Sequence, residues 1–123
     1  MNKTRREALS ALETEIDNTI DILTEAEDDI KAGTFDWGAI KSAAEDFKTR
    51  AEELRDEEQE YYDNMPESFQ NGDKGDNAQA AVSEIESAME ELDLVDTENE
   101  EDRDSVEEHL RSASEYISAA SGY

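Results

Sequence analysis

Cysteine is absent from this chain, and proline, basic residues and long hydrophobic runs are scarce. Without a thiol the chain can form neither a disulfide nor a thiolate metal site. No apolar run approaches the length of about 18 residues that a membrane-spanning helix needs. The first residues, Met-Asn-Lys-Thr-Arg-Arg, lead into a helical pattern rather than an apolar signal block. We therefore expect a soluble protein of the cytoplasm.

The residue patterns that mark catalytic or cofactor sites are also missing. His109 is the only histidine, and Val106 stands where a Glu-x-x-His metal motif would have its glutamate. Asp73 and Asp76 lie among glycines but lack the alternating ligands of a calcium-binding loop. No phosphate-binding glycine loop or nucleophile elbow occurs. The sequence predicts no enzyme, no cofactor and no metal site.

The composition is dominated by acidic residues. The 123 residues are enough for one domain, 35% of them are apolar and 38% are charged, and the net charge is −25. The apolar share is below the usual value of about 45–50%, and composition alone would permit disorder. Apolar residues spaced at helical period argue against disorder and favour a folded helical domain.

Residues 36–65 hold the longest and most aromatic apolar seam, around which we expect the other helices to pack. If Trp37 occupies heptad position a, then Ile40, Phe47, Leu54 and Tyr61 all fall at position d. The remaining a positions are filled by Ala44, Ala51, Glu58 and Met65. Glu58 at such a position suggests either an exposed, functional patch or a glutamate that extends its carboxylate past the helix end to solvent.

Similar seams predict four helices, at about residues 4–32, 36–65, 76–95 and 97–121. We expect an all-α fold: a single domain, 1–123, in which two hairpins form an antiparallel four-helix bundle with coiled-coil-like packing. A single long hairpin that pairs with a second chain is the competing arrangement. Residues 66–75 are predicted as a loop and Gly33 as a helix end. The predicted N-terminal caps are Thr4 with Glu7, Asp36, Asp76 with Gln79, and Thr97 with Glu100.

The charge is distributed unevenly between the two halves of the chain. Residues 1–55 contain 14 acidic and 8 basic residues, whereas residues 56–123 contain 22 acidic and 3 basic residues. The second half therefore carries −19 of the total charge, and repulsion within it opposes folding. A surface that a fold maintains against this repulsion suggests either a binding partner or a requirement for solubility.

Carboxylates on a rigid helix can imitate nucleic-acid phosphates and block the basic groove of a nucleic-acid-binding protein. The expected acidic binding surface consists of Asp56, Glu57, Glu58, Glu60, Asp63, Glu100, Glu101, Asp102, Asp104, Glu107 and Glu108. An aromatic contact patch is expected at Tyr61, Tyr62 and Phe69. The expected partner is a basic, nucleic-acid-binding protein, with no direct binding of this chain to nucleic acid or membranes. A non-catalytic oligomerisation or adaptor module, including a homodimer, is the alternative.

One stretch carries a resemblance to a known group. Residues 57–70, Glu-Glu-Gln-Glu-Tyr-Tyr-Asp-Asn-Met-Pro-Glu-Ser-Phe-Gln, precede Gly-Asp and an alanine-rich acidic helix at 78–92. This pattern resembles small acidic helical proteins of bacteriophages, over about residues 45–95, in which a long helix enters an Asp-Asn-x-Pro-Glu turn and a second helix returns. The resemblance implies a phage-encoded inhibitor of a host nucleic-acid-handling or defence protein, in the host cytoplasm. In charge and size alone, the chain is similar to phage DNA-mimic inhibitors.

The charge asymmetry predicts how stability responds to salt and acid. Added salt screens repulsion between carboxylates, and partial protonation near pH 5 removes some of it. We expect the melting temperature, followed by circular dichroism, to rise from low to moderate NaCl and from pH 7 to pH 5. A melting temperature that falls with added salt would mean that specific ion pairs outweigh the general repulsion.

Overall fold

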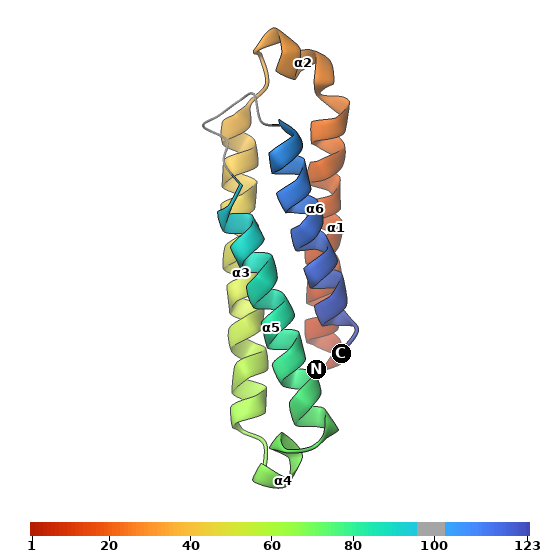
Figure 1. Cartoon of the computed structure of the whole chain (residues 1–123), viewed down its shortest axis with the longest axis vertical. Helices are drawn as coiled ribbons and strands as arrows, with labels where there is room; N and C mark the ends of the chain where they lie inside the picture. Colours follow the sequence, from red (N-terminus) through yellow and green to blue (C-terminus); the bar gives the residue numbers. More distant parts are fainter. Residues whose placement is uncertain (96–102) are drawn as a thin grey trace.

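The computed structural model describes residues 1–95 and 103–123, of which 86% are helical and none is in a strand. The helices are α1 (Lys3–Glu25), α2 (Glu27–Ala32), α3 (Trp37–Asp63), α4 (Glu67–Gln70), α5 (Asp73–Asp93) and α6 (Arg103–Ser121). The predicted all-helical class is confirmed. Figure 1 shows α1, α3, α5 and α6 running lengthwise, with α2 at one end and α4 at the other.

The first predicted helix is divided in two. Ala26 leaves helical geometry, with φ −91° and ψ 13°, and separates α1 from α2. The predicted cap by Thr4 and Glu7 is wrong: the helix starts one residue earlier, and the side chain of Asn2 accepts a hydrogen bond of 2.8 Å from the backbone N–H of Arg5. The predicted end at Gly33 is confirmed by its left-handed φ of 74°.

The second predicted helix matches α3 closely. Asp36 accepts a hydrogen bond of 3.2 Å from the backbone N–H of Ala39, as a helix cap should. The helix stops two residues before Met65, which precedes the single proline. The predicted loop 66–75 is wrong in part, because it contains α4 and the first turn of α5.

The start of α5 also differs from the prediction. Gly72, not Asp76, occupies the N-cap position. Gly75 is buried in the first turn, where α5 passes so close to α4 that a Cβ atom at Gly75 would lie 2.0 Å from the carbonyl oxygen of Gln70. Glycine is therefore required at this position by close backbone approach. The predicted cap of the fourth helix, Thr97 with Glu100, falls outside the described residues.

The core consists of the predicted seams. On α3 every predicted a and d position from Trp37 to Glu58 is buried, and the seam leaves the core only at Tyr61 and Met65. On α6 all five predicted apolar positions are buried. They are Val106, Leu110, Ala113, Ile117 and Ala120. Helical periodicity alone was enough to identify these faces.

The helices do not all contact one another equally. The most extensive contacts join α3 with α5, α5 with α6, and α6 with α1, while α1 and α3 touch over a smaller area. Buried alanines on α5, among them Ala78, Ala81 and Ala88, allow neighbouring helices to approach closely. The main partner of α1 is therefore α6, at the other end of the chain.

Polar contacts between helices add to this packing at several places. Arg50 of α3 pairs with Glu15 of α1 at 2.5 Å, and Ser114 of α6 donates a hydrogen bond of 2.6 Å to Asp17 of α1. Lys48 of α3 lies 2.6 Å from Asp93 at the end of α5. The hydrogen bond from Arg50 holds the pKa of Glu15 below its ordinary value.

No helix in the described part of the chain is long and apolar enough to cross a membrane.

Gly75→Ala tests the close approach of α4 and α5. Because the added methyl would meet a backbone oxygen rather than a flexible side chain, we expect a loss of about 1–3 kcal/mol in the free energy of unfolding. Urea unfolding measures this loss. Gly72→Ala is the control, since its Cβ would lie at an ordinary contact distance of 3.5 Å. Equal effects of the two changes would show that α4 moves aside freely.

Candidate functional site

The predicted acidic residues lie at opposite ends of the molecule. The residues on α3 are near its C-terminal end, beside α4, whereas α6 begins at the end occupied by α2 (Figure 1). They therefore do not form one continuous surface. Glu100, Glu101 and Asp102 fall outside the described residues.

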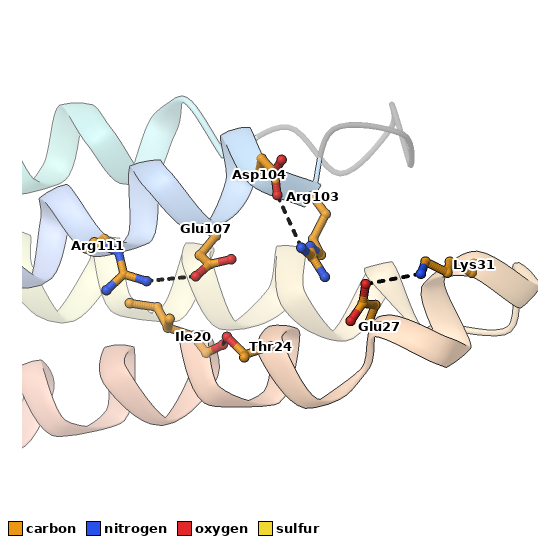
Figure 2. Close-up of polar contacts among 8 residues, drawn as sticks. All are labelled: Ile20, Thr24, Glu27, Lys31, Arg103, Asp104, Glu107 and Arg111. Atoms are coloured by element: carbon orange, nitrogen blue, oxygen red, sulfur yellow. Dashed lines mark hydrogen bonds and ion pairs between the residues drawn. The ribbon is translucent and has the colours of Figure 1, made fainter.

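At the α2 end, two of the three predicted acids are paired with basic residues of their own helix. Asp104 lies 3.3 Å from Arg103, and Glu107 lies 2.7 Å from Arg111 (Figure 2). Of these three acids, Glu108 alone is exposed without an ion pair to a described residue. Two of the three described acids predicted at this end thus already have a basic partner within their own helix.

At the α4 end, the predicted acids other than Glu58 are exposed on the last turns of α3. Asp56 pairs with the adjacent Arg55 at 2.9 Å, and Asp63 accepts a hydrogen bond of 3.0 Å from Gln59. Glu57 and Glu60 have no cation within ion-pair distance in the described part of the chain. We call Asp56, Glu57, Glu60 and Asp63 the acidic end. Its charge is available to a partner.

Glu58 does not belong to this surface, and both expectations for it are wrong. Its side chain is fully buried, and its Oε2 accepts a hydrogen bond of 2.8 Å from Nε of Arg5 on α1. The amino group of Met1 lies 3.6 Å from its other oxygen. A buried carboxylate requires such cations, because desolvation of an unpaired charge is very unfavourable. Glu58 is thus a structural residue that ties α1 to α3.

A cleft of about 560 Å³ opens beside this ion pair, and we call it the end cleft. Arg5 contributes one wall, while Tyr61 of α3, Met65 just beyond α3 and Phe69 of α4 contribute its apolar surface. Glu57 and Glu60 of the acidic end also line it. The end cleft therefore combines apolar surface with carboxylates that have no ion-pair partner among the described residues.

The structure separates the three predicted aromatic residues. Tyr61 and Phe69 line the end cleft, but Tyr62 does not. Tyr62 is half-buried, and its backbone carbonyl accepts a hydrogen bond of 3.0 Å from the side chain of Gln70. Adjacent residues on a helix point about 100° apart, so a pair of neighbouring tyrosines cannot share one face.

Two cations of the end cleft were missed by the sequence analysis. The guanidinium of Arg5 lies 5.1 Å from the ring centre of Tyr61, and the ammonium of Lys74 lies 5.5 Å from that of Phe69. A charged residue on the α3 seam, Glu58, was a signal that some cation must be buried opposite it. Nothing in the sequence indicated which cation, because Arg5 is 53 residues away.

Among the described residues, no group of three or more histidine, cysteine, aspartate or glutamate side chains is arranged to hold a metal ion. The site is thus described by charge, apolar surface and shape.

Comparison of the chain with protein-family models, with curated proteins and with solved structures finds no match.

Glu58→Ala tests the buried ion pair. Removing the carboxylate leaves Arg5 without its partner, and we expect the free energy of unfolding to fall by about 3–5 kcal/mol. Glu57→Ala is the matched control: it is the next residue on the helix, is exposed, and should change stability by no more than about 0.5 kcal/mol. Denaturant unfolding measures both.

A double variant separates the ion pair from simple packing. Arg5→Met combined with Glu58→Met removes both charges at similar volume and should recover much of the loss. If Glu58→Ala unfolds no more readily than Glu57→Ala, the ion pair does not hold the end of the molecule together.

Proposed function

We propose that this protein is a non-catalytic acidic inhibitor that binds the basic, nucleic-acid-binding site of another protein. The partner is a host protein that handles nucleic acid or acts in antiviral defence, and the inhibitor is encoded by a bacteriophage and acts in the host cytoplasm. The chain itself binds neither nucleic acid nor membranes. In the strongest form of the proposal, its carboxylates imitate DNA phosphates.

The observation that carries this proposal is the unpaired charge of the acidic end. Glu57 and Glu60 are exposed on a regular helix and have no cation within ion-pair distance among the described residues. Most basic side chains elsewhere in those residues are already engaged with carboxylates. A partner with lysine and arginine side chains would gain attraction here without breaking internal pairs.

The spacing of the carboxylates also supports the proposal. Residues one turn apart on a helix are separated by about 5.4 Å along its axis. Successive phosphates of one DNA strand rise by about 3.4 Å. A row of carboxylates on the last turns of α3 thus places negative charges at distances of the same order as a phosphate backbone does.

The phage origin rests on the resemblance of residues 57–70 and the following acidic helix to small acidic phage proteins. Glu57, Glu60 and Asp63 of the acidic end, and Phe69 of the end cleft, fall within this stretch. The part of the chain that resembles this group therefore supplies most of the candidate site.

We also propose that the four long helices form an antiparallel bundle of two hairpins with coiled-coil-like packing. The seven-residue seam on α3 and the alternating 4,3 spacing on α6 support this arrangement, because such seams pack at shallow crossing angles. The two short helices, α2 and α4, then lie at the ends of the bundle (Figure 1).

Oligomerisation or an adaptor role is a second candidate function. It is supported by Phe69, whose side chain is half-exposed at the end of the molecule. An interface between two copies would bring the two acidic ends together, however, and repulsion between them opposes this arrangement. We therefore favour a basic partner.

Neutralisation of the acidic end tests the proposed function. The protein should capture a nucleic-acid-binding protein from bacterial lysate at low salt and release it at high salt. In an anisotropy assay with labelled duplex DNA, it should then compete with DNA for the captured protein. The variant Asp56→Asn, Glu57→Gln, Glu60→Gln and Asp63→Asn should compete at least about tenfold less well, because four charge contacts are lost.

A matched control carries the same change in net charge elsewhere. Asp21→Asn, Glu25→Gln, Asp28→Asn and Glu45→Gln neutralise four exposed acids outside the acidic end, and should leave competition within about threefold of the original protein. If both variants compete with DNA equally poorly, the acidic end is not the binding surface. If the captured protein has no nucleic-acid site, the proposed function is wrong.

A further inference from the structure

The end cleft contains the most exposed aromatic residue in the described part of the chain. The side chain of Phe69 is 51% exposed, whereas the other aromatic side chains there are buried or half-buried. An exposed aromatic surface beside Met65 and Tyr61 is unusual in a chain with so much charge, and contiguous apolar surface of this kind marks interaction sites.

The surroundings of the end cleft determine the charge of the group that fits it. Residues 56–76 contain eight acidic residues and one basic residue, Lys74. The other cation that lines the cleft, Arg5, is already matched by Glu58. An anionic ligand would therefore meet Glu57, Glu60 and the net charge of the whole protein, and would be repelled.

Lys74 shows how a cation behaves at this position. Its ammonium lies over the ring of Phe69 and has no carboxylate within ion-pair distance among the described residues. The face of Phe69 is thus a favourable place for a positive charge, as expected for an aromatic ring. Because Lys74 already lies over this ring, a cation supplied by a partner would be held by the carboxylates of Glu57 and Glu60.

We propose that the end cleft receives an apolar side chain from a basic segment of the protein partner, with flanking arginine or lysine side chains paired to Glu57 and Glu60. This inference rests on the proposed function, because it assumes a basic partner, and it adds the chemistry of the segment that binds. A volume of about 560 Å³ is sufficient for a leucine or an aromatic side chain. Apolar anchors ringed by polar contacts supply much of the affinity of protein interfaces.

The methionine methyl groups provide the test, because the chain contains three methionines in different surroundings. Met65 lines the end cleft, whereas Met89 of α5 packs against the core and serves as the internal control. Protein labelled with ¹³C at the methionine methyl groups is titrated with two capped peptides of equal charge, Arg-Arg-Leu-Arg-Arg and Arg-Arg-Gly-Arg-Arg. NMR follows the methyl signals.

The leucine peptide should shift the Met65 signal saturably, leave the Met89 signal in place, and bind at least about tenfold more tightly than the glycine peptide, since it buries a leucine side chain. Phe69→Ala should abolish this difference between the peptides. Ile22→Ala is the matched control, because Ile22 is also half-exposed, at 52%, but lies on α1 outside the cleft. It should leave the difference unchanged.

Other outcomes would overturn the inference in distinguishable ways. Equal binding of the two peptides with no shift of Met65 would refute the anchor in the end cleft and leave the acidic end as a purely electrostatic surface. Tighter binding of a control peptide, Asp-Asp-Leu-Asp-Asp, would assign the cleft to an anionic ligand instead. Failure of all three peptides to bind at low salt would refute the anchor and count against a basic partner as well.

Discussion

A buried carboxylate needs a cation beside it, and the geometry of the α4 end depends on the ion pair that Glu58 forms with Arg5. Its partner, Arg5, comes from the first turn of α1, so the ion pair fixes the start of the chain against the last third of α3. The same guanidinium lies over the ring of Tyr61 and so helps to orient a wall of the end cleft. One buried interaction therefore joins two helices that otherwise contact each other little, and it also shapes the candidate site.

Outside the core, the helices must be held together against their own negative charge. Ion pairs between helices help where they exist, as between Glu15 and Arg50. The hydrogen bond from Arg50 lowers the pKa of Glu15, so this carboxylate stabilises the fold at neutral pH and loses that contribution as the pH falls through its lowered pKa. Relief of the general repulsion between carboxylates acts in the opposite direction. Acid thus has two opposed effects on the stability of the same molecule.

The buried faces of the helices could be predicted from the sequence, because apolar residues recur on them at helical spacing. The faces of α3 and α6 were identified correctly because large apolar residues recur at helical spacing on a charged background. Helix ends were predicted less reliably from local residue signals. The break at Ala26 has no glycine or proline to mark it, and α4 is a single turn inside a segment rich in turn-forming residues. The candidate site could be predicted only in part. The exposed acids and Phe69 were recognised from the sequence. The burial of Glu58 was not, because it depends on pairing with Arg5, which is distant in sequence and which no local pattern reveals.

The position of the charges limits the proposed mimicry of DNA. Helix α3 has 27 residues and is therefore about 40 Å long, and the acids of α6 begin at its far end. A compact basic site would contact one end at a time, and two of the four acids of α6, Asp104 and Glu107, are already paired. The four carboxylates of the acidic end occupy only the last turns of α3, too short a row to imitate a long duplex. We infer that charge guides the approach of a partner, while the end cleft beside those carboxylates, with its exposed Phe69, supplies the selectivity that charge alone lacks.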